Sequence, residues 1–126
     1  MIRVNLLADP AADSGAYVLL DVEFLAAVDV PPHVNRFEDL IVAVLDGELV
    51  FVVDGHRQVV EAGGHLRVPR GVPRRATARG PARALVLAIP AGIERLRDVL
   101  SDRRISRDDR AALLAAAGIH RVPAAW

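Results

Sequence analysis

The chain has 126 residues, and its 16 Lys plus Arg balance 16 Asp plus Glu, so the formal net charge is zero. This length suits one domain with a core large enough to fold alone. A neutral chain with 4% aromatic residues has neither the charge nor the stacking platforms typical of nucleic-acid binding. No apolar run approaches the roughly 20 residues that span a bilayer. We expect neither a nucleic-acid nor a membrane partner.

Cysteine is absent, which excludes disulfides, thiol catalysis and thiolate-bound zinc. Polar residues interrupt the apolar ones near the start, at Arg3, Asn5 and Asp9, so no secretory signal is indicated. The expected localisation is cytoplasmic. Every Lys or Arg position holds Arg, which indicates a compositional bias and weakens any inference from a single arginine.

The first third of the chain predicts strands. Met1–Leu7 is expected to form a short edge strand, and Ala8–Gly15 a loop. From Tyr17 to Val28 every even position is apolar, and this period of two predicts a strand. Pro31-Pro32 cannot lie in a central ladder and predict a strand start or bend before His33.

The middle of the chain contains apolar runs at Leu40–Leu45, Leu49–Val53, Arg57–Ala62, Leu66–Val68 and Ala82–Ile89. Asp46-Gly47 and Asp54-Gly55 separate the first three, and Asp-Gly between apolar runs favours a hairpin. Gly63-Gly64 predicts a turn and Pro69–Pro73 a rigid loop. Short strands at this regular spacing predict a sandwich or barrel.

The end of the chain changes to helical spacing, which predicts amphipathic helices over Ala91–Arg104 and Arg107–Ala117. Ser106 and Asp109 are typical of a helix cap, and Gly118 of a helix end. We expect residues 1–90 to form a single β-barrel domain and residues 91–126 a helical extension packed on it.

Two segments, Pro31–Gly55 and Gly63–Arg75, resemble the two motifs of the cupin superfamily. The turn-forming positions match at Gly47, Gly64, Pro69, Gly71 and Pro73. The resemblance implies an all-β fold, the double-stranded β-helix or jelly-roll barrel of cupins, here followed by C-terminal α-helices.

The metal-ligand positions of the cupin motifs do not match. In metal-binding cupins these positions hold three His and one Glu, whereas this chain has His33, Asn35, Leu40 and Arg74 there. Leucine cannot ligate, and a cationic arginine repels a divalent ion. Glu38 and Asp39 could replace Leu40, but strand alternation predicts that Asp39 points away, and the direction of Glu38 is left open. We therefore expect no metal and no other cofactor.

The same positions predict a small-molecule site in the barrel. Arg74 could hold a carboxylate, phosphate or enolate, and Asn35 and Leu40 would line the substrate. His33, as the catalytic residue, could exchange a proton near neutral pH. The leading hypothesis is a metal-independent isomerase, epimerase or cyclase that acts on an anionic or carbonyl-bearing metabolite and could belong to a biosynthetic pathway. The alternatives are a non-catalytic binding or sensor cupin and, less favoured, a metal-dependent dioxygenase or decarboxylase.

Two surface features remain. No acidic residue occurs between Glu61 and Glu94, where six arginines fall, and we favour a solvated edge over an electrostatic funnel there. Val50 and Val52, and the run Leu85–Leu87, predict strands covered on both faces. Cupins commonly pair through such sheets, so we expect a homodimer.

Overall fold

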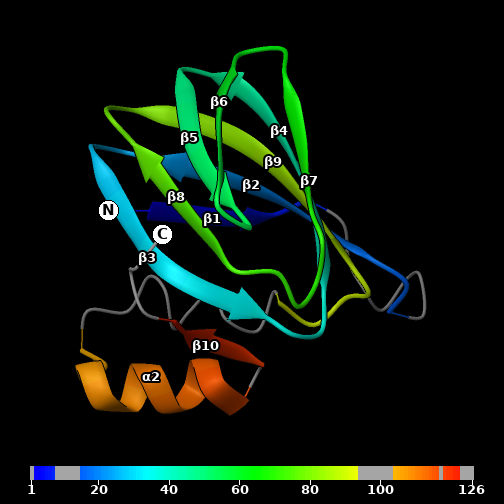
Figure 1. Cartoon of the computed structure of the whole chain (residues 1–126), viewed down its shortest axis with the longest axis vertical. Coiled ribbons are helices and arrows are strands. Elements are labelled where there is room, and N and C mark those ends of the chain that lie inside the picture. Colours follow the sequence, from blue (N-terminus) through cyan, green and yellow to red (C-terminus); the bar gives the residue numbers. More distant parts are fainter. Residues whose placement is uncertain (1, 8–14, 94–103, 117, 123–126) are drawn as a thin grey trace.

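The computed structural model describes residues 2–7, 15–93, 104–116 and 118–122. Two antiparallel five-stranded sheets face each other around a shared core (Figure 1). Sheet one has the order β1 (Ile2–Leu6), β2 (Val18–Phe24), β9 (Ala82–Ile89), β4 (Asp39–Asp46), β7 (His65–Val68). Sheet two has the order β10 (Ile119–Arg121), β3 (Val28–Asn35), β8 (Arg74–Ala78), β5 (Glu48–Val53), β6 (His56–Glu61). The predicted all-β barrel is confirmed.

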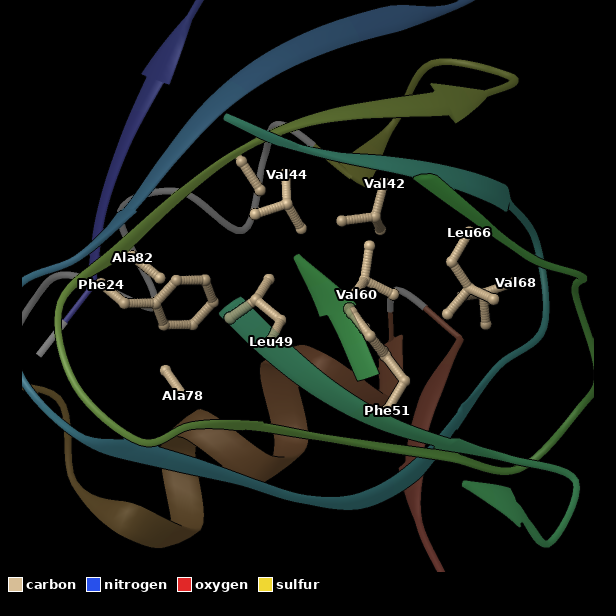
Figure 2. Close-up of a cluster of buried hydrophobic side chains, with 11 residues drawn as sticks. Phe24, Val42, Val44, Leu49, Phe51, Val60, Leu66, Val68, Ala78 and Ala82 are labelled. Carbon is tan, nitrogen blue, oxygen red and sulfur yellow. The ribbon is translucent and has the colours of Figure 1, made fainter. Parts of the chain in front are cut away.

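The core lies between the two sheets. In β2, β4 and β9 the strand registers pair even-numbered residues with even-numbered ones. The even-numbered side chains therefore share the inner face of sheet one. Leu49, 1% exposed, extends from sheet two into the middle of this cluster (Figure 2). The buried cluster consists of Phe24, Val42, Val44, Leu49, Phe51, Val60, Leu66, Val68, Ala78, Ala82 and Ala84.

The apolar alternation over residues 17–28 spans two strands rather than one. β2 ends at Phe24 in sheet one, and β3 begins at Val28 in sheet two. The pattern continues across the connection because each strand has one face on the same core.

The two Asp-Gly pairs behave differently. Asp54-Gly55 joins β5 to β6 as a hairpin, with positive φ at both residues, as predicted. The hairpin predicted at Asp46-Gly47 is wrong, because this pair connects β4 of sheet one to β5 of sheet two. Gly47 is needed for packing, since a Cβ there would lie 2.6 Å from the carbonyl oxygen of Pro81.

The sequence analysis missed two strands. β8 contains Ala76 and Ala78, which have low β-propensity, and it becomes a strand because β3 and β5 pair with it on both sides. β10 lies in the C-terminal part of the chain, which is therefore not purely helical.

Helix α2 (Arg107–Ala116) agrees with the predicted second helix, and Ser106 caps it by accepting a hydrogen bond from the Asp109 amide at 3.1 Å. The predicted Ala91–Arg104 helix falls mostly on residues 94–103, outside the described residues. No helix in the described ranges is long and apolar enough to cross a membrane.

The outer face of sheet one is apolar at its centre. Leu87 lies opposite Leu19 on one side and Ile41 on the other, and Leu85 lies opposite Ala43. Ion pairs such as Arg83–Asp21, 2.6 Å apart, flank this centre. The outer face of sheet two is more polar, because the Arg75–Asp29 pair and Thr77 border Val50. The predicted homodimer stays a prediction.

Candidate functional site

His33 and Asn35 reach the inner face of sheet two because β3 contains a bulge. Val30 lies opposite Ala76 and His33 opposite Arg74, so two prolines on β3 oppose the single residue Arg75 on β8. The extra residue reverses the alternation, since a regular strand continuing from Val30 would turn Pro32 and Val34 inward instead. The predicted bend is therefore a bulge inside a strand, and it orients the site.

Arg74 is buried at this end of the barrel, with 3% of its surface exposed. Its Nε donates to the Val72 carbonyl at 2.9 Å, and its Nη2 to the Pro69 carbonyl at 2.7 Å. Its Nη1 is buried and has no hydrogen-bond partner among the described residues. Burial lowers the Arg74 pKa to about 10, against the opposing effects of Glu38 and Asp39, so the guanidinium stays charged at neutral pH.

His33 is held as a neutral base. Its Nδ1 lies 2.8 Å from the Pro31 carbonyl oxygen, which can only accept, so Nδ1 carries the hydrogen. The lone pair of the neutral ring is then at Nε2. Burial lowers the His33 pKa, and so does the charge of Arg74, while the hydrogen bond to Pro31 acts against them.

Asn35 supports the local backbone through its side chain. It is 1% exposed, and its Oδ1 accepts hydrogen bonds from the amides of Phe37 at 3.2 Å and Glu38 at 3.4 Å. Its own carbonyl accepts from the Gly71 amide at 2.8 Å. Asn35 thus fixes the β3–β4 turn and the loop before Arg74. The predicted contact of the Asn35 side chain with a substrate stays a prediction.

The sequence analysis left Glu38 undecided, and the structure buries it, at 5% exposure. Among the neighbouring charges, the Glu38 carboxylate does most to raise the Arg74 pKa and so favours the charged guanidinium. The signal in the sequence is Asn35 three residues earlier, because asparagine often caps a tight turn through its side chain. Asp39 points outward to Arg70, with Oδ2 and Nη2 3.2 Å apart, as strand alternation predicts.

Leu40 is part of the core, where it packs against both apolar clusters of the barrel. At the Arg74 position a buried N–H donor faces inward where a metal would need a lone pair. No three His, Asp or Glu side chains among the described residues could together hold a metal ion. The residues present do not fit the divalent metal of metal-binding cupins.

Asn35 and Arg74 are almost fully enclosed, at 1% and 3% exposure. Two hollows of the described chain, about 240 and 320 Å³, are lined by other residues. One, between Tyr17 and Ile89, lies on the outer face of sheet one. Because Nη1 of Arg74 is buried, a ligand can reach it only if part of the surrounding protein moves.

The arginine-rich segment forms no electrostatic funnel. Four of its arginines pair with carboxylates on neighbouring strands or loops, as Arg70–Asp39, Arg75–Asp29, Arg79–Glu48 and Arg83–Asp21. These pairs neutralise most of the local charge, in line with the solvated-edge interpretation. His56 and His65 are exposed, and each begins a strand, β6 and β7 respectively.

Together these features define a small double-sheet barrel in which an arginine occupies a metal-ligand position. Residues 22–90, more than half of the chain, match the cupin domain family. The chain belongs to this family. No curated protein matches it.

Solved structures agree on the fold. KdgF from Halomonas sp. is 19% identical, with a TM-score of 0.66 over 75% of this chain and 84% of that one. An RmlC-like cupin from Shewanella frigidimarina is 20% identical, with a TM-score of 0.65 over 74% and 79%. A cupin superfamily protein from Desulfitobacterium hafniense is 19% identical, with a TM-score of 0.62 over 71% and 77%. At these identities the likeness concerns the fold alone.

Proposed function

We propose that this cupin binds a small anionic or carbonyl-bearing molecule at Arg74 and moves a proton within it through His33, without a metal. The observation that supports this most is the buried Nη1 of Arg74, which has no hydrogen-bond partner among the described residues. A buried donor without a partner costs free energy, so a ligand oxygen that accepts from it gains more than a solvent-exposed pair would.

His33 supplies the complementary group. It lies directly opposite Arg74 in the β3–β8 ladder, and the lone pair of its neutral ring is at Nε2. With a ligand carbonyl on Arg74, Nε2 would remove a proton from the adjacent carbon. The C–H electrons would form a C=C bond while the carbonyl oxygen became an enolate held by the guanidinium. Return of the proton to the opposite face of the same carbon would give epimerisation. Where that carbon carries a hydroxyl, transfer of the hydroxyl proton to the enolate oxygen and return of the carbon-bound proton to the former carbonyl carbon would give isomerisation.

A non-catalytic binding or sensor cupin is the second candidate. It is favoured by the two hydrogen bonds that fix Arg74 to the carbonyls of Pro69 and Val72. A ligand that moves this loop would change the shape of the barrel end without any chemical step. The metal-dependent alternatives are disfavoured, because the donor set does not fit a metal.

Pyruvate in D₂O tests the proposal, because it carries a carboxylate, a carbonyl and exchangeable protons. We expect the wild type to speed deuterium exchange into the methyl group, followed by NMR. His33→Gln should lower the exchange rate about 10²–10⁴-fold, the usual contribution of a general base, with pyruvate affinity retained. Arg74→Lys should weaken pyruvate binding about tenfold, because an ammonium lacks the planar fork of donors.

Arg75→Lys is the matched control, since Arg75 is the next residue on β8 and faces outward to Asp29. Equal pyruvate affinity in the Arg74 and Arg75 variants would contradict the proposed site. Binding that depends on Arg74, without any exchange, would select the binding or sensor function instead.

A further inference from the structure

The C-terminal strand β10 lies along the strand that carries His33. The register places Ile119 opposite Asn35 and Arg121 opposite His33, and Figure 1 shows β10 beside β3. Backbone hydrogen bonds extend the pairing beyond both ends of β10, from Arg36 N to Gly118 O at 2.9 Å and from Val122 N to Pro32 O at 3.2 Å. The edge of the candidate site is thus built from the far end of the chain.

This placement is fixed by packing as well as by hydrogen bonds. Gly118 is buried with φ +82°, and a Cβ built on it would lie 2.6 Å from the Phe37 ring. Phe37 belongs to the turn that Asn35 caps. The C-terminal segment therefore packs on the same turn that shapes the site.

Three strands place one ionisable side chain each in a single row. Arg121 of β10, His33 of β3 and Arg74 of β8 are successive partners across the sheet. Partners in an antiparallel ladder project to the same face. Strands lie about 4.8 Å apart, so the two arginine Cα atoms are roughly 10 Å apart with His33 between them.

The two arginines differ in their surroundings. Arg74 is buried beside the carboxylate of Glu38, whereas Arg121 is exposed and forms no ion pair within the described ranges. If one anionic group of a ligand binds Arg74, the charge of Arg121 is still available for a second anionic group of the same ligand.

We infer, building on the proposed function, that Arg121 is a second anion-binding residue. The ligand then carries two acidic groups, one held by each arginine, and His33 faces the carbons between them. Small dicarboxylates, or molecules with one carboxylate and one phosphate, have this chemistry.

Calorimetric titration at fixed ionic strength tests this with acetate, malonate, succinate and glutarate as probes. We expect the best dicarboxylate to bind the wild type at least about tenfold more tightly than acetate. Arg121→Ala should lower that dicarboxylate affinity about tenfold and leave acetate affinity within about twofold. Arg121 is exposed on an edge strand, so the variant should fold, which circular dichroism checks.

Arg57→Ala is the matched control, because Arg57 is exposed on β6, the opposite edge strand of the same sheet. It should change neither affinity. Equal effects of the Arg121 and Arg57 variants, or an equal loss of acetate and dicarboxylate binding in the Arg121 variant, would overturn the inference. If acetate binding still depends on Arg74, measured with Arg74→Lys, the proposed function survives that result. If no carboxylate binds the wild type, both fail.

Discussion

The two ends of the barrel interior are built in opposite ways. At one end Phe24, Leu49 and Ala78 pack in a wholly apolar cluster (Figure 2). At the other, reached along β8 from Ala78 to Arg74, buried polar groups collect, and Nη1 of Arg74 has no hydrogen-bond partner in the part of the chain that the structure describes. Apolar burial stabilises the fold, whereas a buried donor without a partner destabilises it. We propose that the first end sustains the fold and that the second is kept for binding.

Leu49→Ala should give the largest effect, because Leu49 is at the centre of the apolar end with 1% exposure. Removing a buried leucine side chain costs about 2–5 kcal/mol in lost apolar burial and in the cavity left behind. Urea unfolding should show this as a lower midpoint with an unchanged slope. Val59→Ala, at an outer position 45% exposed, should stay within about 0.5 kcal/mol of the wild type. A cost below about 1 kcal/mol for Leu49→Ala would mean that the two ends do not differ as argued.

The outer face of sheet one extends the comparison to an apolar surface that is half-buried among the described residues. We propose that a second copy covers it, because an apolar centre around Leu87 flanked by ion pairs has the composition of an interface core and rim. Leu87→Glu would bury a carboxylate without a partner at a cost of several kcal/mol. We expect about a hundredfold weaker dimer, measured by analytical ultracentrifugation.

Val59→Glu is the control for this prediction, since it adds the same charge to the outer face of sheet two. It should leave the dimer intact. A wild type that is monomeric at micromolar concentrations would rule the dimer out, and disruption by Val59→Glu alone would move the interface to sheet two.

The fold was predictable because turns and alternation are local properties. Gly47, Gly71 and Asp54-Gly55 mark their turns through backbone conformation, and each appears as a turn or connection in the structure. Which sheet a strand joins is not local. The Asp46-Gly47 connection was misassigned for this reason, since a hairpin and a crossing between sheets can use the same two residues.

The candidate site was predictable in position but not in chemistry. The resemblance to the cupin motifs placed His33 and Arg74 together, and the structure pairs them. The sequence could not show that backbone amides occupy the Asn35 oxygen, or that the turn buries Glu38. Arg121 was missed because its approach to His33 depends on a strand pairing between residues far apart in the chain.

The smallest effect concerns His33, whose pKa in the folded protein is lowered, chiefly by burial, from the usual 6.5. Below pH 6.5 the unfolded chain binds a proton at this position more readily than the folded one, so stability should fall as the pH drops from 7 toward 5. Because one proton is involved, the unfolding free energy changes by at most about 1.4 kcal/mol per pH unit. The carboxyls of Asp21, Asp29 and Asp39 have pKa values lowered from 3.8, so their contribution to stability is retained between pH 5 and 7.

His33→Gln should flatten the dependence of the unfolding free energy on pH between 5 and 7, measured by urea titration. His56→Gln, at an exposed position, should not. Parallel profiles for wild type and His33→Gln would show that His33 is not held as a neutral base, and the proton transfer assigned to it would then lose its physical basis.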